Sequence, residues 1–299
     1  METRTLKTVQ DLVTKCLLLQ DPQVCFSLLR KCIAFTHGVF LSRACSPRLV
    51  KGVLAKMDSL VQTAFSTLVG FTPKDSQSKQ ITLSTSRGGI GLRSSVLHAP
   101  AAYLASIIAC ASLDGWDVTV AQDFTVVLEM VRALTHRPQL GANNEYSNCS
   151  QHELSASIDD LQLKGLLDTL PKIDCARLLS CSSGGIASAW LTAVPSRYAS
   201  TAIAPACFIV ALKLYLGAVV CVEDICPCCH KLMDTNGYHA TTCKGYYSLS
   251  RRHDSCTEEG TSHSYEQRDL KPKLYILQKP AVTFCFCVLA LARLLSTLP

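Results

Sequence analysis

The chain has 299 residues and a formal net charge of +6, with 48% hydrophobic and 17% charged residues. This composition supplies enough apolar side chains for a buried core and excludes gross disorder, and the length allows one large domain or two smaller ones. The mildly basic charge permits contact with nucleic-acid phosphates but does not require it.

The chain contains seventeen cysteines. The first seven residues carry charge and no long apolar segment follows them, so we expect no secretory signal. We therefore predict a reducing intracellular compartment, the nucleus or the cytoplasm. Clustered thiols there are expected to be metal ligands rather than disulfides.

Apolar residues recur at three- and four-residue steps over residues 5–35, which predicts helix. Asp21 followed by Pro22 is typical of a helix start, so we expect two helices with a break near Gln20. A third helix is predicted over residues 49–69, where an apolar stripe ends at Gly70. We expect a polar linker over residues 72–79 and a short strand over residues 81–84.

The next segment, Ser-Arg-Gly-Gly-Ile-Gly-Leu-Arg, runs from Ser86 to Arg93. Its glycine spacing does not match the dinucleotide-binding fingerprint. Arg87 and Arg93 flank a glycine turn and could hold a phosphate. The alternative, which we favour, is a structural turn before a helix.

Apolar periodicity predicts helices over residues 97–113, 116–134 and 155–170, with a polar loop over residues 136–150. Asp159 and Asp160 form a pair like the metal-binding pair of polymerase palms, which lies on a β-hairpin. Their neighbours here have helical spacing, so we interpret the pair as part of a solvated helix face.

Further helices are predicted over residues 176–180 and 205–216, and Trp190 is expected to be a packed anchor between them. No nucleophile constellation is apparent in the sequence. His98, His136, His152 and His253 have no recognisable partner pattern, and residues 182–185 lack nucleophile-elbow spacing.

The sequence from Cys226 to Cys243 predicts a metal site. Cys226 and Cys229 are separated by two residues, which suits one tight turn, and His239 and Cys243 are spaced for one helical turn. Three sulfurs and one imidazole form the ligand set that Zn²⁺ prefers. Asn236-Gly237 between the pairs is a strong turn signal that could fold the second pair back onto the first.

Other ligands for this site stay open in the sequence. Cys228 lies inside the first pair, and Cys221 and His230 are close enough to compete. A loop rich in free cysteines is the alternative to a metal site, because clusters also arise by chance in a cysteine-rich chain.

Basic and aromatic residues follow the last cysteine. Lys244, Arg251, Arg252 and His253 surround two tyrosines, a combination that suits nucleic-acid contact. Residues 254–280 are polar and predicted to be irregular. Residues 281–292 form an apolar run that is short for a membrane span, so a helix packed on the body is preferred to a membrane anchor.

Several motifs occur in an order that resembles a known family. They are Leu-Leu-Arg-Lys-Cys from residue 28, Arg-Gly-Gly-Ile-Gly-Leu-Arg-Ser from 87, His-Ala-Pro-Ala-Ala-Tyr from 98, Ala-Arg-Leu-Leu-Ser from 176, Ser-Ala-Trp-Leu from 188, the Cys/His segment and Arg252-His253. Over residues 10–253 the chain is similar to the region after the polymerase palm in reverse transcriptases of non-LTR retrotransposons. The group concerned carries a Cys-Cys-His-Cys knuckle and a restriction-like endonuclease.

The resemblance implies a mainly α protein with a thumb-like region (1–135), a loop (136–152), a helical linker (153–220), a zinc knuckle (221–253) and an irregular tail (254–299). It implies Cys226, Cys229, His239 and Cys243 as zinc ligands and DNA or RNA as partner. The palm aspartates would lie upstream of residue 1, and the nuclease residues do not follow His253. We therefore expect a non-catalytic fragment that binds nucleic acid weakly, without a small-molecule substrate. The alternative is a zinc-stabilised protein-interaction module.

Overall fold

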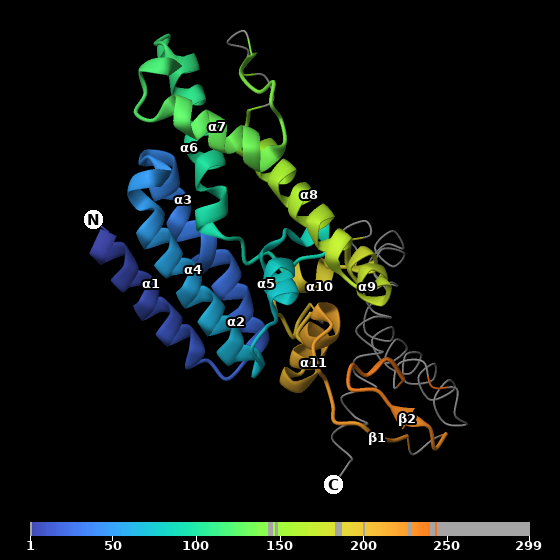
Figure 1. The fold of residues 1–299 in the computed structure, drawn as a ribbon. Coiled ribbons are helices and arrows are strands. Elements are labelled where there is room, and N and C mark those ends of the chain that lie inside the picture. Colours follow the sequence, from blue (N-terminus) through green and yellow to red (C-terminus); the bar gives the residue numbers. More distant parts are fainter. Residues whose placement is uncertain are drawn as a thin grey trace, which may run out of the picture. The chain divides into compact units, whose positions relative to one another are not determined.

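The computed structural model describes residues 2–142, 146, 149–182, 187–199, 201–226, 229–239 and 243. The prediction of a mainly α protein is confirmed, because the described part consists of helices joined by turns and one short hairpin (Figure 1). The chain divides into two compact units, residues 1–175 and 176–299. The predicted tail segments over residues 254–280 and 281–292 lie outside the described residues.

The first unit contains helices α1 to α8. Their bounds are α1 Glu2–Leu17, α2 Pro22–Leu28, α3 Ala34–Ala44, α4 Pro47–Val69, α5 Asp75–Thr82, α6 Ser95–Asp114, α7 Phe124–Thr135 and α8 Gln151–Thr169. A π-helical turn, Leu29–Ile33, joins α2 to α3, and 3₁₀ turns lie at Thr85–Arg87 and Val118–Val120. Helix α9, Lys172–Ser182, contains the boundary between the two units.

The predicted break near Gln20 is confirmed by the start of α2. An oxygen of the Asp21 side chain accepts hydrogen bonds from the backbone N–H groups of Gln23 at 2.9 Å and Val24 at 3.1 Å. These amides belong to the first helical turn and have no partner within the helix, so the carboxylate stabilises the helix start. Pro22 occupies the first helical position, where its missing N–H costs nothing.

The predictions for residues 72–84 are wrong, and the helix predicted over residues 116–134 begins only at Phe124. The predicted linker over residues 72–79 and strand over residues 81–84 are replaced by helix α5 and the turn that follows it. The buried face of α5 includes the polar side chains of Gln77 and Gln80, so an apolar stripe is missing from the sequence. Gln77 accepts the Lys74 N–H at the helix start, and Gln80 donates to the Gly88 carbonyl at 2.9 Å.

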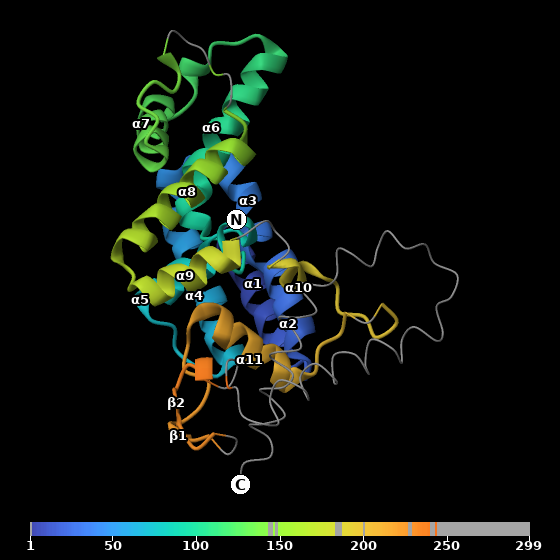
Figure 2. The ribbon, with the colours of Figure 1, turned by 90° about the vertical axis from the view of Figure 1, so that its right-hand side faces the viewer.

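Helices α6, α7 and α8 lie side by side in both views and enclose one apolar core (Figure 2). Its fully buried members include Leu104 on α6, Val127 and Val131 on α7, and Leu154 and Ile158 on α8. Burial of aliphatic side chains on this scale contributes about 1.5–3 kcal/mol for each. The core therefore fixes α8 and the polar side chains that α8 carries.

Helix α4 packs against α1, α2, α3 and α6. Phe26 of α2 meets Phe65 of α4 edge to face, with ring centroids 6.4 Å apart, and both rings are fully buried. Edge-to-face packing adds about 0.5–1.5 kcal/mol to the effect of burial. The long helix over residues 49–69 is thus confirmed as a core element.

Two stretches, Pro22–Ala44 and Ser95–Asp114, are long and apolar enough to cross a membrane by length and composition alone. This is weak evidence, because core helices of soluble proteins pass the same test. In the structure, α6 contacts α3, α4, α7 and α8, and half of its apolar window is buried.

The second unit is built around Trp190, as predicted. The indole on α10, Ala189–Thr192, meets the rings of Phe208 and Tyr215 edge to face at 5.8 and 5.9 Å. Both partner rings belong to α11, Pro205–Leu216, the helix predicted over these residues. Gly217, with φ 63°, ends α11, and the chain continues toward the hairpin of β1, Asp224–Ile225, and β2, Leu232–Met233.

Candidate metal centre

Four predicted ligands converge beside the β1–β2 hairpin. The ligand atoms of Cys226, Cys229, His239 and Cys243 all lie within 4.8 Å of one another. The Sγ atoms of Cys226 and Cys243 are 3.7 Å apart, and Cys229 Sγ is 3.2 Å from His239 Nε2. Zinc bonds of about 2.3 Å to sulfur and 2.0–2.1 Å to nitrogen place tetrahedral ligand atoms about 3.6–3.8 Å apart. The cluster could therefore hold a metal ion after small side-chain shifts.

The first ligand pair lies on a tight turn between the two strands. The Cys226 N–H donates to the Lys231 carbonyl, and the His230 N–H donates to the Cys226 carbonyl, both at 2.8 Å. The pKa of the Cys229 thiol is raised: the Lys231 N–H lowers it, but desolvation and the neighbouring sulfurs of Cys243 and Cys226 raise it more. A cation that replaces the thiol protons would remove this repulsion among the sulfurs.

The second ligand pair is joined by a backbone hydrogen bond of helical spacing, which agrees with the prediction. The Cys243 N–H donates to the His239 carbonyl at 2.7 Å. The Asn236-Gly237 turn is also confirmed: the Gly237 N–H donates to the Asp234 carbonyl at 3.0 Å. Gly237 has φ 77°, a conformation that glycine adopts without steric cost. This turn brings the second pair back to the first.

One side of the cluster is apolar. Cys226 and Cys243 are buried beside Met233, whereas Cys229 and His239 are half-buried. Buried thiols away from water favour neutral forms unless a cation compensates their charge. The packing of Met233 against the two buried thiols would exclude water from the sulfur side of a bound ion.

Two of the three alternative ligands, Cys221 and His230, lie outside the convergent set. The Cys221 thiol donates to the Asp234 carbonyl, with Sγ and O 3.4 Å apart. His230 is exposed and does not belong to the cluster of four. Cys228 lies outside the described residues.

Comparison with known proteins gives no match: no family model, curated protein or solved structure is significantly similar to the chain. The site is therefore interpreted from its own geometry.

His230 offers a test of the ligand assignment. It adopts the left-handed region with φ 55°, where glycine avoids a steric cost of about 1 kcal/mol. His230→Gly is expected to leave metal stoichiometry unchanged and affinity equal or slightly tighter, measured by competition with a chelating dye. A clear loss of affinity would show instead that this imidazole is a ligand.

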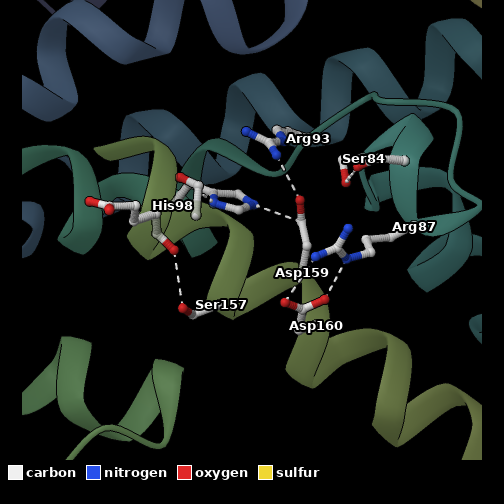
Figure 3. Close-up of polar contacts among 10 residues, drawn as sticks. Ser84, Arg87, Arg93, His98, Ser157, Asp159 and Asp160 are labelled. Carbon is white, nitrogen blue, oxygen red and sulfur yellow. Dashed lines mark hydrogen bonds and ion pairs between the residues drawn. The ribbon is translucent and has the colours of Figure 1, made fainter. Parts of the chain in front are cut away.

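The two arginines of the glycine loop bind carboxylates of α8 (Figure 3). Arg87 forms a two-pronged ion pair with Asp160, and Arg93 Nη2 lies 2.6 Å from Asp159 Oδ2. The glycines between them close the turn: a Cβ on Gly89 would lie 2.1 Å from the Leu83 carbonyl oxygen. The loop thus has the structural role that we favoured. Phosphate binding by Arg87 and Arg93 stays a prediction.

The Asp159 environment corrects one interpretation. Helix α8 is confirmed, but only Asp160 lies on a solvated face, because the Asp159 side chain is 1% exposed. Asp159 Oδ1 lies 3.6 Å from Nε2 of the fully buried His98, whose Nδ1 lies 3.2 Å from Ser155 Oγ. Burial raises the pKa of Asp159 more than Arg93 lowers it. The sequence does not indicate this burial, because the partner Arg93 lies 66 residues earlier in the chain.

Burial of His98 predicts acid sensitivity. Burial, aided by the positive charge of Arg93, lowers the pKa of His98 from 6.5 to about 3. His98 therefore binds a proton near pH 6.5 in the unfolded chain but only near pH 3 in the folded chain. Stability consequently falls as the pH decreases through this interval. The slope is about 1.4 kcal/mol per pH unit, or about 2 kcal/mol between pH 7 and 5. The raised pKa of Asp159 has the opposite effect on stability, between its ordinary value of 3.8 and its value in the folded chain, where stability increases as the pH decreases.

His98→Phe should reduce this difference between pH 7 and pH 5 by about 2 kcal/mol. Urea unfolding of both proteins, with a chelator present so that the metal cluster contributes to neither, measures the difference. An equal loss of stability in both proteins would contradict the assignment to His98.

The remaining predicted contacts with nucleic acid, Lys244, Arg251, Arg252 and His253, lie outside the described residues. Asp234 was not predicted from the sequence, and its carboxylate accepts the Tyr238 N–H at 3.0 Å and the His239 N–H at 2.6 Å. An Asp shortly before a predicted helical turn is a capping signal that could have indicated it.

Proposed function

We propose that the cluster binds zinc and that the ion has a structural role. Convergence of three sulfurs and one imidazole within 4.8 Å supports this proposal most strongly. This ligand set suits Zn²⁺, and four protein ligands fill a tetrahedral coordination shell, leaving no position for a substrate. Two strands of two residues bury too little apolar surface to be stable alone, so metal binding would supply much of the folding free energy of the knuckle predicted over residues 221–253.

We further propose that the chain is a non-catalytic module, derived from a reverse transcriptase of a non-LTR retrotransposon, that binds DNA or RNA weakly. The order of the motifs and the basic residues that follow Cys243 in the sequence support it. Because Arg87 and Arg93 are paired with carboxylates, the proposal depends mainly on Lys244, Arg251 and Arg252.

An enzymatic role is not part of the proposal. Ser155, His98 and Asp159 line up in the order of a hydrolase triad. All three side chains are buried, with at most 2% exposed, so no substrate could reach the serine in this conformation.

Nucleic-acid binding is tested by titrating the full, zinc-loaded chain with single- and double-stranded DNA and RNA across a salt series. A variant with Lys244, Arg251 and Arg252 replaced by glutamine should bind more weakly. Its log–log salt slope should be shallower by about 0.7–0.9 for each phosphate that the variant no longer neutralises. The control replaces Lys7, Lys51 and Lys56, which are exposed on α1 and α4, and should bind like the unmodified chain.

The alternative function is a zinc-stabilised protein-interaction module. It is favoured by the outer face of the hairpin, where Ile225 and Leu232 are cross-strand neighbours and are 61% and 65% exposed. Weak nucleic-acid affinity without salt dependence, combined with full zinc occupancy, would reject nucleic-acid binding and leave this alternative.

A further inference from the structure

The Asp234 carboxylate is tied to the turn that carries the second ligand pair. Its two oxygens accept the N–H groups of Tyr238 and His239 separately, at 3.0 and 2.6 Å. Tyr238 and His239 are the first helical residues after the turn at Gly237, so no earlier helical carbonyl is available to accept their N–H groups. A carboxylate at this position also interacts favourably with the positive end of the turn.

The backbone around Asp234 is held from the other side by the segment that precedes β1. The carbonyl of Thr235 accepts the N–H groups of Val220 at 2.8 Å and Cys221 at 3.2 Å. The carbonyl of Asp234 accepts the Cys221 thiol and the Gly237 N–H. None of these bonds involves a ligand side chain, so they can hold Asp234 in place before a metal arrives.

We propose that Asp234 is the positioning residue of the metal centre. It orients the turn of Tyr238 and His239 so that the imidazole Nε2 faces Cys229 Sγ, at 3.2 Å, before an ion binds. This inference rests on the proposed zinc site and adds a residue that makes no bond to the metal itself.

Direct attraction between the Asp234 carboxylate and the metal ion cannot be the source of this effect. Three thiolates already exceed the charge of a divalent ion, so a further negative charge nearby is electrostatically neutral or unfavourable for binding. The benefit must come from the two hydrogen bonds and the geometry that they impose. Removing the bonds should therefore weaken metal binding even though a negative charge is removed with them.

The test measures zinc affinity of the full chain by competition with a chelator, and records Co²⁺ absorption spectra. Loss of an outer-shell partner typically costs about 10–100-fold in metal affinity, and Asp234→Ala is expected to fall in this range. Asp234→Asn keeps one acceptor oxygen and should recover part of the loss. The matched control is Asp224→Ala, which removes an exposed carboxylate of β1 that bonds the adjacent Ile225 N–H. It should bind like the unmodified chain.

The Co²⁺ spectra distinguish positioning from general destabilisation. In Asp234→Ala the sulfur-to-cobalt charge-transfer bands should persist while the d–d bands shift toward those of His239→Ala, because water competes with the misplaced imidazole. Unchanged affinity and d–d bands in Asp234→Ala, or an equal loss in Asp224→Ala, would overturn the inference. A wild-type chain that binds no metal would overturn the proposed zinc site together with it, whereas normal wild-type binding separates the two.

Discussion

Replacing Arg93 with alanine is expected to lower the free energy of unfolding by about 3–5 kcal/mol, because it leaves the charge of Asp159 buried without its cationic partner. The Asp159 side chain is 1% exposed, and the guanidinium reaches it at 2.6 Å from a loop 66 residues earlier in the chain. Equilibrium unfolding in urea at pH 7 measures the change.

The neighbouring pair provides a matched control. Arg87 binds Asp160 from the same loop, but these side chains are 34% and 54% exposed, so water screens their attraction. Arg87→Ala should therefore cost less than about 1 kcal/mol. Equal losses in the two variants would contradict the difference in burial on which this prediction depends.

Replacing Cys226 with serine should abolish tight metal binding. The substitution removes a thiolate that is 3% exposed and 3.7 Å from the sulfur of Cys243. Loss of a direct ligand should exceed the effect of outer-shell substitutions, so zinc affinity is expected to fall by more than about 100-fold. Competition with a chelating dye measures the affinity, and limited proteolysis shows whether the knuckle becomes accessible.

Cys221→Ser is the control for this prediction. Its thiol contacts the Asp234 carbonyl and lies outside the cluster of four ligands. Serine can keep a hydrogen bond to that carbonyl, so affinity should change little. A loss as large as that of Cys226→Ser would place Cys221 among the ligands instead.

Local signals were sufficient for much of the helical fold and for the metal cluster. Asp21-Pro22 marked the start of α2, and the spacing of cysteine and histidine marked four side chains that converge. These predictions succeeded because capping and ligand pairing on a turn depend on residues close in sequence.

Predictions failed where distant contacts decide the outcome. Helix α5 was not predicted because glutamines occupy its buried face. The burial of Asp159 was not predicted because its partners Arg93 and His98 lie about 60 residues away in the chain. The role of Asp234 depends on the backbone N–H groups of Tyr238 and His239, and its only sign in the sequence is an Asp shortly before a predicted helical turn.

The metal content of the purified chain tests the central claim most directly. Protein expressed with zinc in the medium, passed through a desalting column and measured by native mass spectrometry should carry one zinc ion per chain. The ion should be absent from the Cys226→Ser variant. A wild-type chain that holds no stoichiometric metal, or that keeps the ion after this substitution, would contradict the assignment of Cys226, Cys229, His239 and Cys243 as a zinc centre.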